Sequence, residues 1–295
     1  MKILVTGAAG QLGKALQRVI PRLLPDVETI FADRHALDLL DGDEVMRRVE
    51  RGEFTHIVNC AGYTAVDKAE EEKAACTAAN IDAAANIAAA AYAFGAKLIH
   101  ISSDYVFDGR QWRPYIEGDK VNPLSHYGTT KRRSETRVLA AMPEAIIVRT
   151  QWLYGLGGKN FVETMLSRAE KSQPGEAISV VADQTGAPTN ADNLAEALVC
   201  MIKSRQWVPG IYHYANEGTA TWYDFAMAIF RIAGIKANVK PIATEDYPTA
   251  ATRPHYTVLD RRKIKATYSI SIPHWEESLT RYLKERKAFA QGGTK

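Results

Sequence analysis

A serine, a tyrosine and a lysine in this sequence have the types and spacing needed to reduce a carbonyl group. Ser103 ends a short apolar run, and Tyr127 and Lys131 stand four residues apart in a segment with helical character. A spacing of four places both side chains on one face of a helix, so the ammonium can lie beneath the phenol. The adjacent cation is expected to lower the pKa of Tyr127, which would then protonate a carbonyl oxygen while Ser103 donates a hydrogen bond to it.

Reduction also needs a hydride donor, and a glycine-rich turn near the amino terminus supplies its expected binding site. Gly7, Gly10 and Gly13 follow the apolar run 3–5 directly and open a helical segment. Gly7 would permit a tight turn, Gly10 would let the backbone approach a pyrophosphate, and Gly13 would let the helix pack closely on the sheet. The helix terminus would stabilise the phosphates. We therefore expect a dinucleotide to contact Gly7, Gly10, Gln11, Leu12 and Gly13.

The ends of the next two apolar runs carry further residues that suit a dinucleotide. Asp33 and Arg34 follow the run 27–31. An acidic side chain there would bind the ribose hydroxyls of NADH, whereas a basic one would bind the 2′-phosphate of NADPH. Both types are present, so the choice stays open, with NADPH slightly favoured. The other residues expected at the cofactor are Asp38, Leu39, Cys60, Ala61, Gly62, Tyr127 and Lys131.

These residues need a scaffold that brings strand ends together. Short apolar runs without strict alternation recur near residues 57–59, 98–101 and 146–148, each followed by a helical segment. Apolar runs that alternate with helices are typical of parallel strands covered on both faces. The sequence therefore predicts an α/β fold with a doubly wound, parallel Rossmann sheet. Helices are expected near residues 12–20, 43–51, 73–94, 127–141, 161–171, 191–202, 221–232 and 274–285.

Beyond Tyr154 the alternation weakens, because glycines and prolines interrupt the elements. We expect residues 1–150 and 176–205 to form an NAD(P)-binding Rossmann domain, to which the second segment adds a strand at 177–181 and a helix. Residues 151–175 and 206–295 are expected to form a smaller C-terminal substrate-binding lobe. No low-complexity linker separates the two, so they should be interwoven.

Composition narrows the choice of partners. The 295 residues carry a formal net charge of only +3 with the two signs interleaved, which argues against nucleic acid. No apolar stretch reaches the roughly 20 residues that cross a membrane, and the dispersed histidines lack metal-ligand spacing. Cys60, Cys76 and Cys200 are widely spaced, as in reduced cytoplasmic proteins. A cytoplasmic enzyme with a small-molecule substrate and no metal is expected.

Several motifs, taken in order, resemble the extended short-chain dehydrogenase/reductases over nearly the whole chain. They are Gly-Ala-Ala-Gly-Gln-Leu-Gly from Gly7, Tyr-Thr-Ala-Val-Asp-Lys-Ala-Glu from Tyr63, Ser-Ser-Asp-Tyr-Val-Phe-Asp-Gly from Ser102, Tyr-Gly-Thr-Thr-Lys from Tyr127, Arg-Thr-Gln-Trp-Leu-Tyr from Arg149 and Asp-Gln-Thr-Gly-Ala-Pro-Thr from Asp183. The branch that they resemble acts on nucleotide sugars. The resemblance implies NAD(P)H-dependent reduction of the 4-keto group of dTDP-4-dehydro-β-L-rhamnose to dTDP-L-rhamnose.

The resemblance also implies roles for single residues. Ser103, Tyr127 and Lys131 match the catalytic positions of the family, with Tyr127 as the proton donor. The positions that match substrate contacts are Asp104, Tyr105, Trp152, Gln184 and Arg253. An indole suits a sugar ring, and a guanidinium suits a diphosphate. Some relatives bind magnesium at a dimer interface through a glutamate on the first helix, where this chain has Ala15. Magnesium is therefore doubtful, and the choice between monomer and homodimer stays open.

Two other functions on the same fold remain as alternatives. An epimerase or dehydratase would hold NAD tightly and return the hydride to the sugar. A dehydratase would need further carboxylates beside Ser103, and although Asp104 is present, no glutamate follows it. A non-catalytic, NAD(P)-binding regulatory subunit is the other alternative, and the intact set of Ser103, Tyr127 and Lys131 argues against it.

Overall fold

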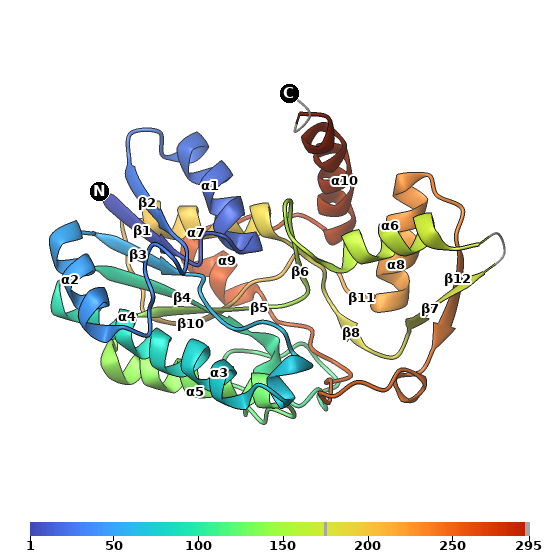
Figure 1. Ribbon diagram of the computed structural model, residues 1–295, viewed down its shortest axis with the longest axis horizontal. Coiled ribbons are helices and arrows are strands. Elements are labelled where there is room, and N and C mark those ends of the chain that lie inside the picture. The colour runs from blue at the N-terminus through green and yellow to red at the C-terminus, as the bar shows by residue number, and fades with distance from the viewer. Residues whose placement is uncertain (174–175, 293–295) are drawn as a thin grey trace.

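The computed structural model describes residues 1–173 and 176–292, with side chains as far as residue 289. A large body built around a sheet lies beside a smaller lobe, and the chain crosses between them more than once (Figure 1). Within the described residues, every helix is too short or too polar to cross a membrane.

Six parallel strands organise the large body. They are β1 (Lys2–Thr6), β2 (Glu28–Ala32), β3 (His56–Asn59), β4 (Lys97–Ser103), β5 (Ile146–Thr150) and β10 (Gly210–His213), in the spatial order β2-β1-β3-β4-β5-β10. The chain leaves β1 toward β2 on one side and returns to β3 on the other. The carboxyl ends of β1 and β3 therefore form the switch point at which such sheets bind ligands. The predicted doubly wound fold is confirmed.

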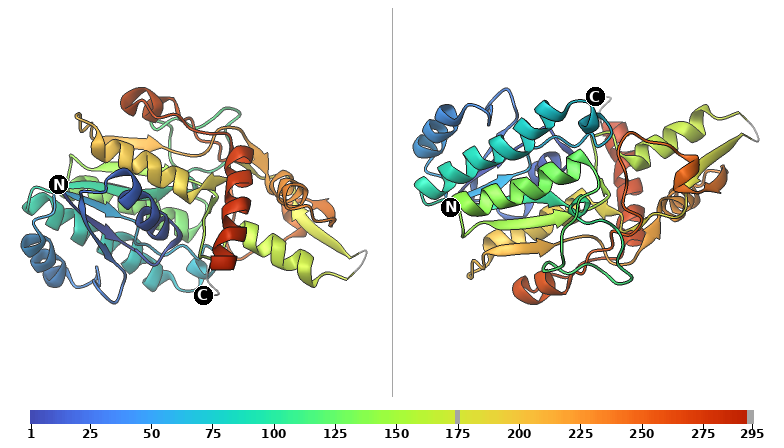
Figure 2. Two further views of the ribbon diagram at one scale, coloured as in Figure 1. Left: turned by 90° about the horizontal axis from the view of Figure 1, so that it is seen from above. Right: turned by 90° about the horizontal axis from the view of Figure 1, so that it is seen from below.

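Alternate residues of each strand are buried on opposite faces of the sheet. Ile3 and Val5 belong to one hydrophobic cluster and Leu4 belongs to the other. The first face is covered by α1 (Gln11–Leu23), α7 (Ala191–Lys203) and α9 (Arg262–Tyr268), and the second by α2 (Gly42–Gly52), α4 (Ala83–Ala93) and α5 (His126–Ala141). The left view of Figure 2 shows α1 and α7, and the right view shows α4 and α5.

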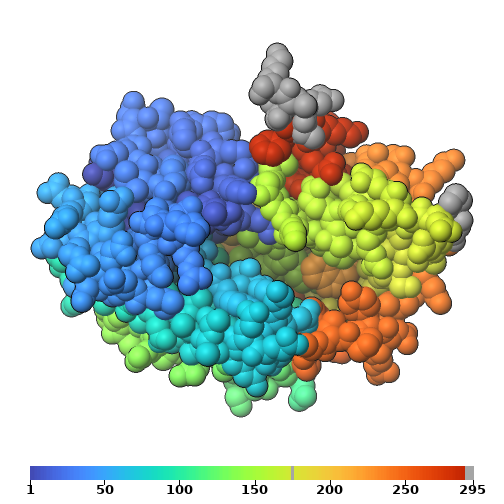
Figure 3. Space-filling model, in the orientation of Figure 1, coloured from blue at the N-terminus to red at the C-terminus, as the bar shows by residue number. Residues whose placement is uncertain are grey.

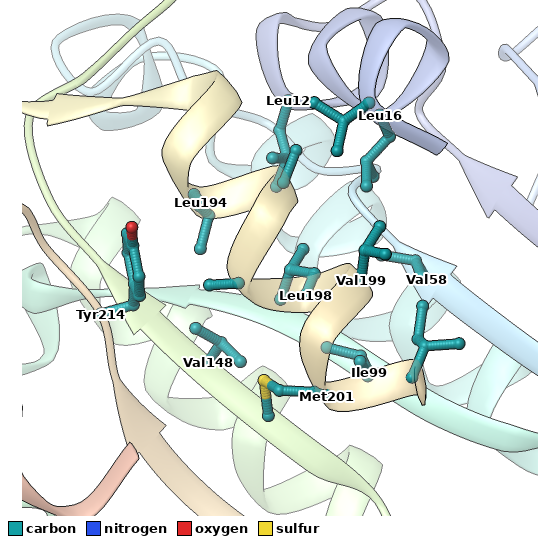
Figure 4. Close-up of a cluster of buried hydrophobic side chains, with 14 of the residues drawn as sticks. Leu12, Leu16, Val58, Ile99, Val148, Leu194, Leu198, Val199, Met201 and Tyr214 are labelled. Carbon is teal, nitrogen blue, oxygen red and sulfur yellow. The ribbon is translucent and has the colours of Figure 1, made fainter. Parts of the chain in front are cut away.

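Helix α7 explains why the first face holds together. Its residues Leu194, Leu198 and Val199 lie between α1 and the strands, where they face Val58 and Val148 (Figure 4). All five side chains are completely buried. This packing fixes α1, and hence the glycine turn that precedes it, against the carboxyl end of β1.

The helix expected over residues 73–94 is interrupted. Helix α3 (Lys73–Thr77) passes into a π-helical turn at Ala78–Asp82 before α4 begins. The turn carries Asn80, whose Oδ1 accepts a hydrogen bond from Tyr63 N (2.8 Å) and whose Nδ2 donates to Thr130 Oγ1 (2.9 Å). π-helical turns are often found at functional sites. This one ties the loop after β3 to α5.

The smaller lobe has its own hydrophobic core. It is built from α6 (Phe161–Lys171), β7 (Ala177–Val181), α8 (Trp222–Ala233), β12 (Asn238–Ile242) and α10 (Trp275–Gly292). Two short strand pairs support its border with the large body: β6 (Leu153–Tyr154) with β9 (Thr189–Asn190), and β8 (Thr185–Gly186) with β11 (Ala220–Thr221).

Three segments lie on the opposite side of the expected domain division. The strand at 177–181, expected in the Rossmann domain, pairs in parallel with β12 in the small lobe. Conversely, β10 and α9, expected in the lobe, belong to the large body, where β10 pairs with β5. An apolar run identifies a strand, but its partner depends on contacts made far along the chain. For the rest of the chain, the two-part division stays a prediction.

Candidate functional site

The carboxyl ends of β1, β2 and β3 border a groove of about 530 Å³. Its lining includes the predicted cofactor residues Gly7, Gly10, Asp33, Arg34, Asp38, Leu39, Ala61 and Gly62. Tyr63, Glu72 and the alanines of α3 and the π-helical turn complete the wall. Parallel strands end at the same edge of the sheet, so residues from three separate segments meet in one groove.

The glycine turn fits a dinucleotide pyrophosphate. Gly7 has a φ of +67°, and a Cβ there would lie 2.6 Å from Ala61 N, so no other residue can occupy this turn without displacing the loop after β3. A Cβ on Gly13 would meet the Gly7 carbonyl oxygen. Helix α1 begins here with no side-chain cap and no acidic residue in its first turn. Its amide groups and dipole are therefore free to bind an anion.

Six predicted cofactor residues lie outside the lining of the groove, with Tyr127 and Lys131 among them. Leu12 and Gly13 are buried where α1 packs on the sheet. Gln11 points toward the small lobe, where its Nε2 donates to Lys159 O at 3.3 Å. The Cys60 thiol is buried, which raises its pKa to about 12. Contact of all the predicted residues with the cofactor stays a prediction.

Asp33 and Arg34 differ in the hydrogen bonds that their charged groups make within the described chain. Asp33 Oδ1 accepts hydrogen bonds from His35 N and Ala36 N, each at 3.0 Å, and so caps its own turn. The Arg34 side chain is exposed, and among the described residues it makes no hydrogen bond or ion pair. An exposed cation just after β2 is well suited to a 2′-phosphate.

Strand β4 and helix α5 bring Ser103, Tyr127 and Lys131 together. Ser125 caps α5 by accepting a hydrogen bond from Gly128 N at 3.1 Å, so the helix begins just before Tyr127. All three predicted catalytic side chains are buried. A Cβ placed on Gly62 would lie 3.9 Å from Lys131 Nζ, so the ammonium borders the cofactor groove.

The ionisable groups of this trio are strongly affected by burial. Burial raises the pKa of Tyr127 above its ordinary range, although the adjacent Ser103 hydroxyl opposes part of the change. Lys131 Nζ donates to Ile101 O at 2.6 Å, and burial lowers its pKa to about 8. The expected lowering of the Tyr127 pKa is therefore wrong in direction. The spacing of four places both residues on α5, but it could not reveal the loss of solvent around the phenol, which dominates the shift.

Asp104 lies directly beside this trio. Its Oδ1 accepts the Ser103 hydroxyl at 2.9 Å, while among the described residues its buried Oδ2 has no hydrogen-bond partner. Burial raises the pKa of Asp104 to about 7. The ring of Tyr105 meets that of Tyr127 edge-on, with centroids 5.5 Å apart. Two of the residues predicted to contact the substrate thus lie beside Tyr127.

A second pocket, of about 230 Å³, opens in the small lobe. It is lined by Gln184 and Arg253, both predicted substrate contacts, and by residues that include Phe161, Arg168, Trp222 and Tyr247. Aromatic walls with two guanidinium groups suit a nucleobase and its phosphates. In Figure 3 the surface is hollowed between the blue and cyan segments of the large body and the yellow-green and orange segments of the lobe.

Trp152 is held in an unusual conformation at the border of the two parts. Its φ is +46°, in the left-handed region, and its ring stacks on Trp222 with centroids 3.6 Å apart and an angle of 8°. A Cβ on Gly186 would lie 2.6 Å from Trp152 Cε2. Strain of this kind persists only where packing enforces it. One face of the indole is already covered, and the predicted sugar contact of Trp152 stays a prediction.

Sequence reasoning missed several residues of this region. Trp222 and Arg168 lie on helices, where a single sequence gives no sign that they face a pocket. Asp67 forms an ion pair with Arg253 (2.7 Å). It lies inside the motif that begins at Tyr63, so the sequence marked this segment but gave Asp67 no function. Among the described residues, no three histidine, cysteine or acidic side chains are placed to hold a metal ion.

Several known proteins resemble this chain over nearly its whole length. The family model described as "RmlD substrate binding domain" matches residues 1–288. The spore coat polysaccharide biosynthesis protein SpsK of Bacillus subtilis is 39% identical over 97% of this chain and 98% of its own. A dTDP-4-dehydrorhamnose reductase structure from Clostridium acetobutylicum has a TM-score of 0.92 at 40% identity, covering 97% of this chain and 100% of that one. The corresponding Bacillus anthracis reductase, solved with NADP, has a TM-score of 0.90 at 37% identity and covers 96% and 99%.

Proposed function

This chain belongs to the RmlD substrate binding domain family, and on that basis we propose that it is an NADPH-dependent reductase of dTDP-4-dehydro-β-L-rhamnose, which it converts to dTDP-L-rhamnose. The observation that carries the proposal is the position of Ser103, Tyr127 and Lys131. Lys131 borders the cofactor groove, while Tyr127 contacts Tyr105, whose phenol interacts electrostatically with Arg253 of the lobe pocket. A substrate bound across the hollow would therefore meet the cofactor at the phenol.

The residues of the trio have complementary roles in this reaction. When bound, the nicotinamide supplies the hydride that reduces the carbonyl carbon. Tyr127 gives its proton to the carbonyl oxygen, and Ser103 stabilises the charge that develops on that oxygen by turning its hydroxyl from Asp104 to the substrate. The raised pKa of Tyr127 keeps the phenol protonated before the reaction. The proton therefore remains available until an oxyanion begins to form.

Lys131 supplies the positive charge of the site. Its pKa of about 8 leaves most of the population protonated at neutral pH. The ammonium would bind the nicotinamide ribose, since it borders Gly62 of the groove, and would stabilise the phenolate that remains after proton transfer. Loss of this charge above pH 8 should reduce turnover.

NADPH is favoured over NADH by the charges at the end of β2. The Asp33 carboxylate is engaged by two backbone amides, while the Arg34 guanidinium is unpaired within the described part of the chain. The free cation matches a 2′-phosphate. We further propose that the enzyme acts in the cytoplasm, where its three free cysteines would stay reduced.

The experiment is to follow NADPH oxidation with dTDP-4-dehydrorhamnose, comparing wild type, Tyr127→Phe and Tyr92→Phe. Tyr127→Phe removes the proton donor and should lower kcat by roughly 10²- to 10⁴-fold while NADPH affinity is retained. Tyr92 is an exposed residue of α4 and serves as the matched control. Unchanged turnover in Tyr127→Phe would remove this residue from the acid role. Substrate conversion without net NADPH oxidation would favour an epimerase or dehydratase, and binding without conversion would favour a regulatory subunit.

A further inference from the structure

One ion pair joins the large body to the small lobe at the edge of the substrate pocket. Arg253 Nη1 donates to Asp67 Oδ1 at 3.0 Å, and Nη2 donates to Asp67 Oδ2 at 2.7 Å. Such a two-point contact fixes the plane of the guanidinium as well as its position. The guanidinium is half-buried and still lines the pocket, so its remaining N–H groups can reach a ligand.

Asp67 is used in a way that its local structure does not require. It precedes the 3-10 turn Lys68–Glu70, at the position where an aspartate normally caps the turn, yet it makes no capping hydrogen bond. Its carboxylate instead reaches the other lobe. There Oδ1 also accepts Ala251 N at 3.2 Å, and Arg253 Nη1 donates to Ala251 O at 3.3 Å. Asp67 thus holds both the backbone and the side chain of the Arg253 loop.

The far end of the same turn is attached to the catalytic helix. Glu70 Oε1 accepts a hydrogen bond at 2.7 Å from the backbone N of His126, the first residue of α5 and the neighbour of Tyr127. One short turn therefore contacts Arg253 at its beginning and the helix of Tyr127 at its end. The separation between these two groups is set by the turn.

We propose that Asp67 is a positioning residue that holds the Arg253 guanidinium ready for the diphosphate of the substrate, at a fixed distance from Tyr127. The inference rests on the proposed function, because it takes the ligand to be a nucleoside diphosphate sugar. In such a ligand the diphosphate and the 4-keto group lie at opposite ends of one rigid ring. An arginine that is already oriented loses less conformational entropy on binding, so affinity rises.

The test is calorimetric titration of the NADP-loaded protein with dTDP, the nucleotide part of the substrate. The variants are Asp67→Asn, Arg253→Ala and the double variant. Asn offers only one acceptor oxygen, so Asp67→Asn should weaken dTDP binding by about tenfold. Because Asp67 acts through Arg253, the double variant should bind no more weakly than Arg253→Ala alone. The affinity for NADP, which reports an intact fold, should stay at the wild-type value.

Asp119→Asn provides the matched control. Asp119 accepts a comparable two-point contact from Arg113, at 2.8 and 2.9 Å, and neither residue lines the groove or the lobe pocket. Its variant should bind dTDP as wild type does. Equal or tighter dTDP binding by Asp67→Asn would overturn the proposal, as would additive losses in the double variant. Wild-type protein that binds NADP but not dTDP would instead refute the proposed substrate.

Discussion

Two fully buried carboxyl groups near α5 differ in how their charges are matched. Glu135, on α5, accepts Arg149 Nε at 2.7 Å and Nη2 at 2.8 Å, and Ser102 Oγ also donates to it at 2.7 Å. Asp104, just after β4, accepts the Ser103 hydroxyl, but its Oδ2 has no partner among the described residues. Buried polar atoms are nearly always paired. Asp104 Oδ2 is among the few buried exceptions in the described chain, and it lies beside Ser103 and Tyr127.

The difference separates a supporting region from a reacting one. The Glu135–Arg149 pair joins α5 to β5 beneath Lys131, and the charge of Glu135 partly offsets the burial that lowers the pKa of Lys131. Asp104 and Tyr127, whose pKa values burial raises, lie just after β4 and at the start of α5. Such groups gather at functional sites.

The largest predicted loss of stability comes from breaking the buried Glu135–Arg149 ion pair. Arg149→Met removes the two-point partner of the buried Glu135 carboxylate and leaves it, among the described residues, only an ion pair with the more exposed Arg132 at 3.6 Å. The substitution should lower the free energy of unfolding by about 3–5 kcal/mol. Urea denaturation monitored by circular dichroism would measure the change. The double variant Glu135→Leu/Arg149→Met removes both charges and should recover much of the loss. If Arg149→Met were as stable as wild type, the pair would have no supporting role.

A smaller, pH-dependent change in stability is expected from the buried carboxyl group of Asp104, whose Oδ2 has no hydrogen-bond partner among the described residues. The pKa of Asp104 is raised from 3.8 to about 7 in the folded state, so between these values the folded protein binds more protons than the unfolded chain. Stability should therefore fall as the pH rises through this range, by on the order of 2–4 kcal/mol.

Asp104→Asn lacks this ionisation, so its advantage over wild type should grow between pH 4.5 and pH 8. Urea denaturation at pH 4.5 and pH 8 measures this difference in the free energy of unfolding. Asp119→Asn is the control, because the pKa of the Asp119 carboxyl is lowered, not raised, in the folded wild type. Parallel pH dependence in wild type and Asp104→Asn would contradict the assignment.

The comparison also shows what could be predicted from the sequence. Ser103 and the glycines of the first turn were found because parallel strands end at one edge, which makes position along the chain a guide to position in space. The pairing of charged side chains between elements could not be predicted from position along the chain. Glu135 and Arg149 lie on different elements, and Asp67 and Arg253 are 186 positions apart.

Burial was the second property that sequence patterns did not supply. The direction of the pKa shift at Tyr127 follows from desolvation, which depends on Tyr105 and the loops that cover the phenol. The stack of Trp152 on Trp222 depends on how the small lobe meets the large body. Both are consequences of tertiary packing, which a single sequence does not encode in any local pattern.

The smallest effect is expected at an unmatched charge on the surface. Arg34, like Asp104, makes no ion pair within the described chain, but it is exposed, so Arg34→Ala should leave stability nearly unchanged. Loss of its contact with a 2′-phosphate should raise the KM for NADPH about tenfold and leave the KM for NADH unaltered. Steady-state kinetics with both cofactors would test this, with the exposed Arg48→Ala as control. An equal rise in KM for both cofactors would mean that Arg34 contacts a part of the cofactor that NADPH and NADH share. The unpaired charge of Arg34 would then not account for a preference for NADPH.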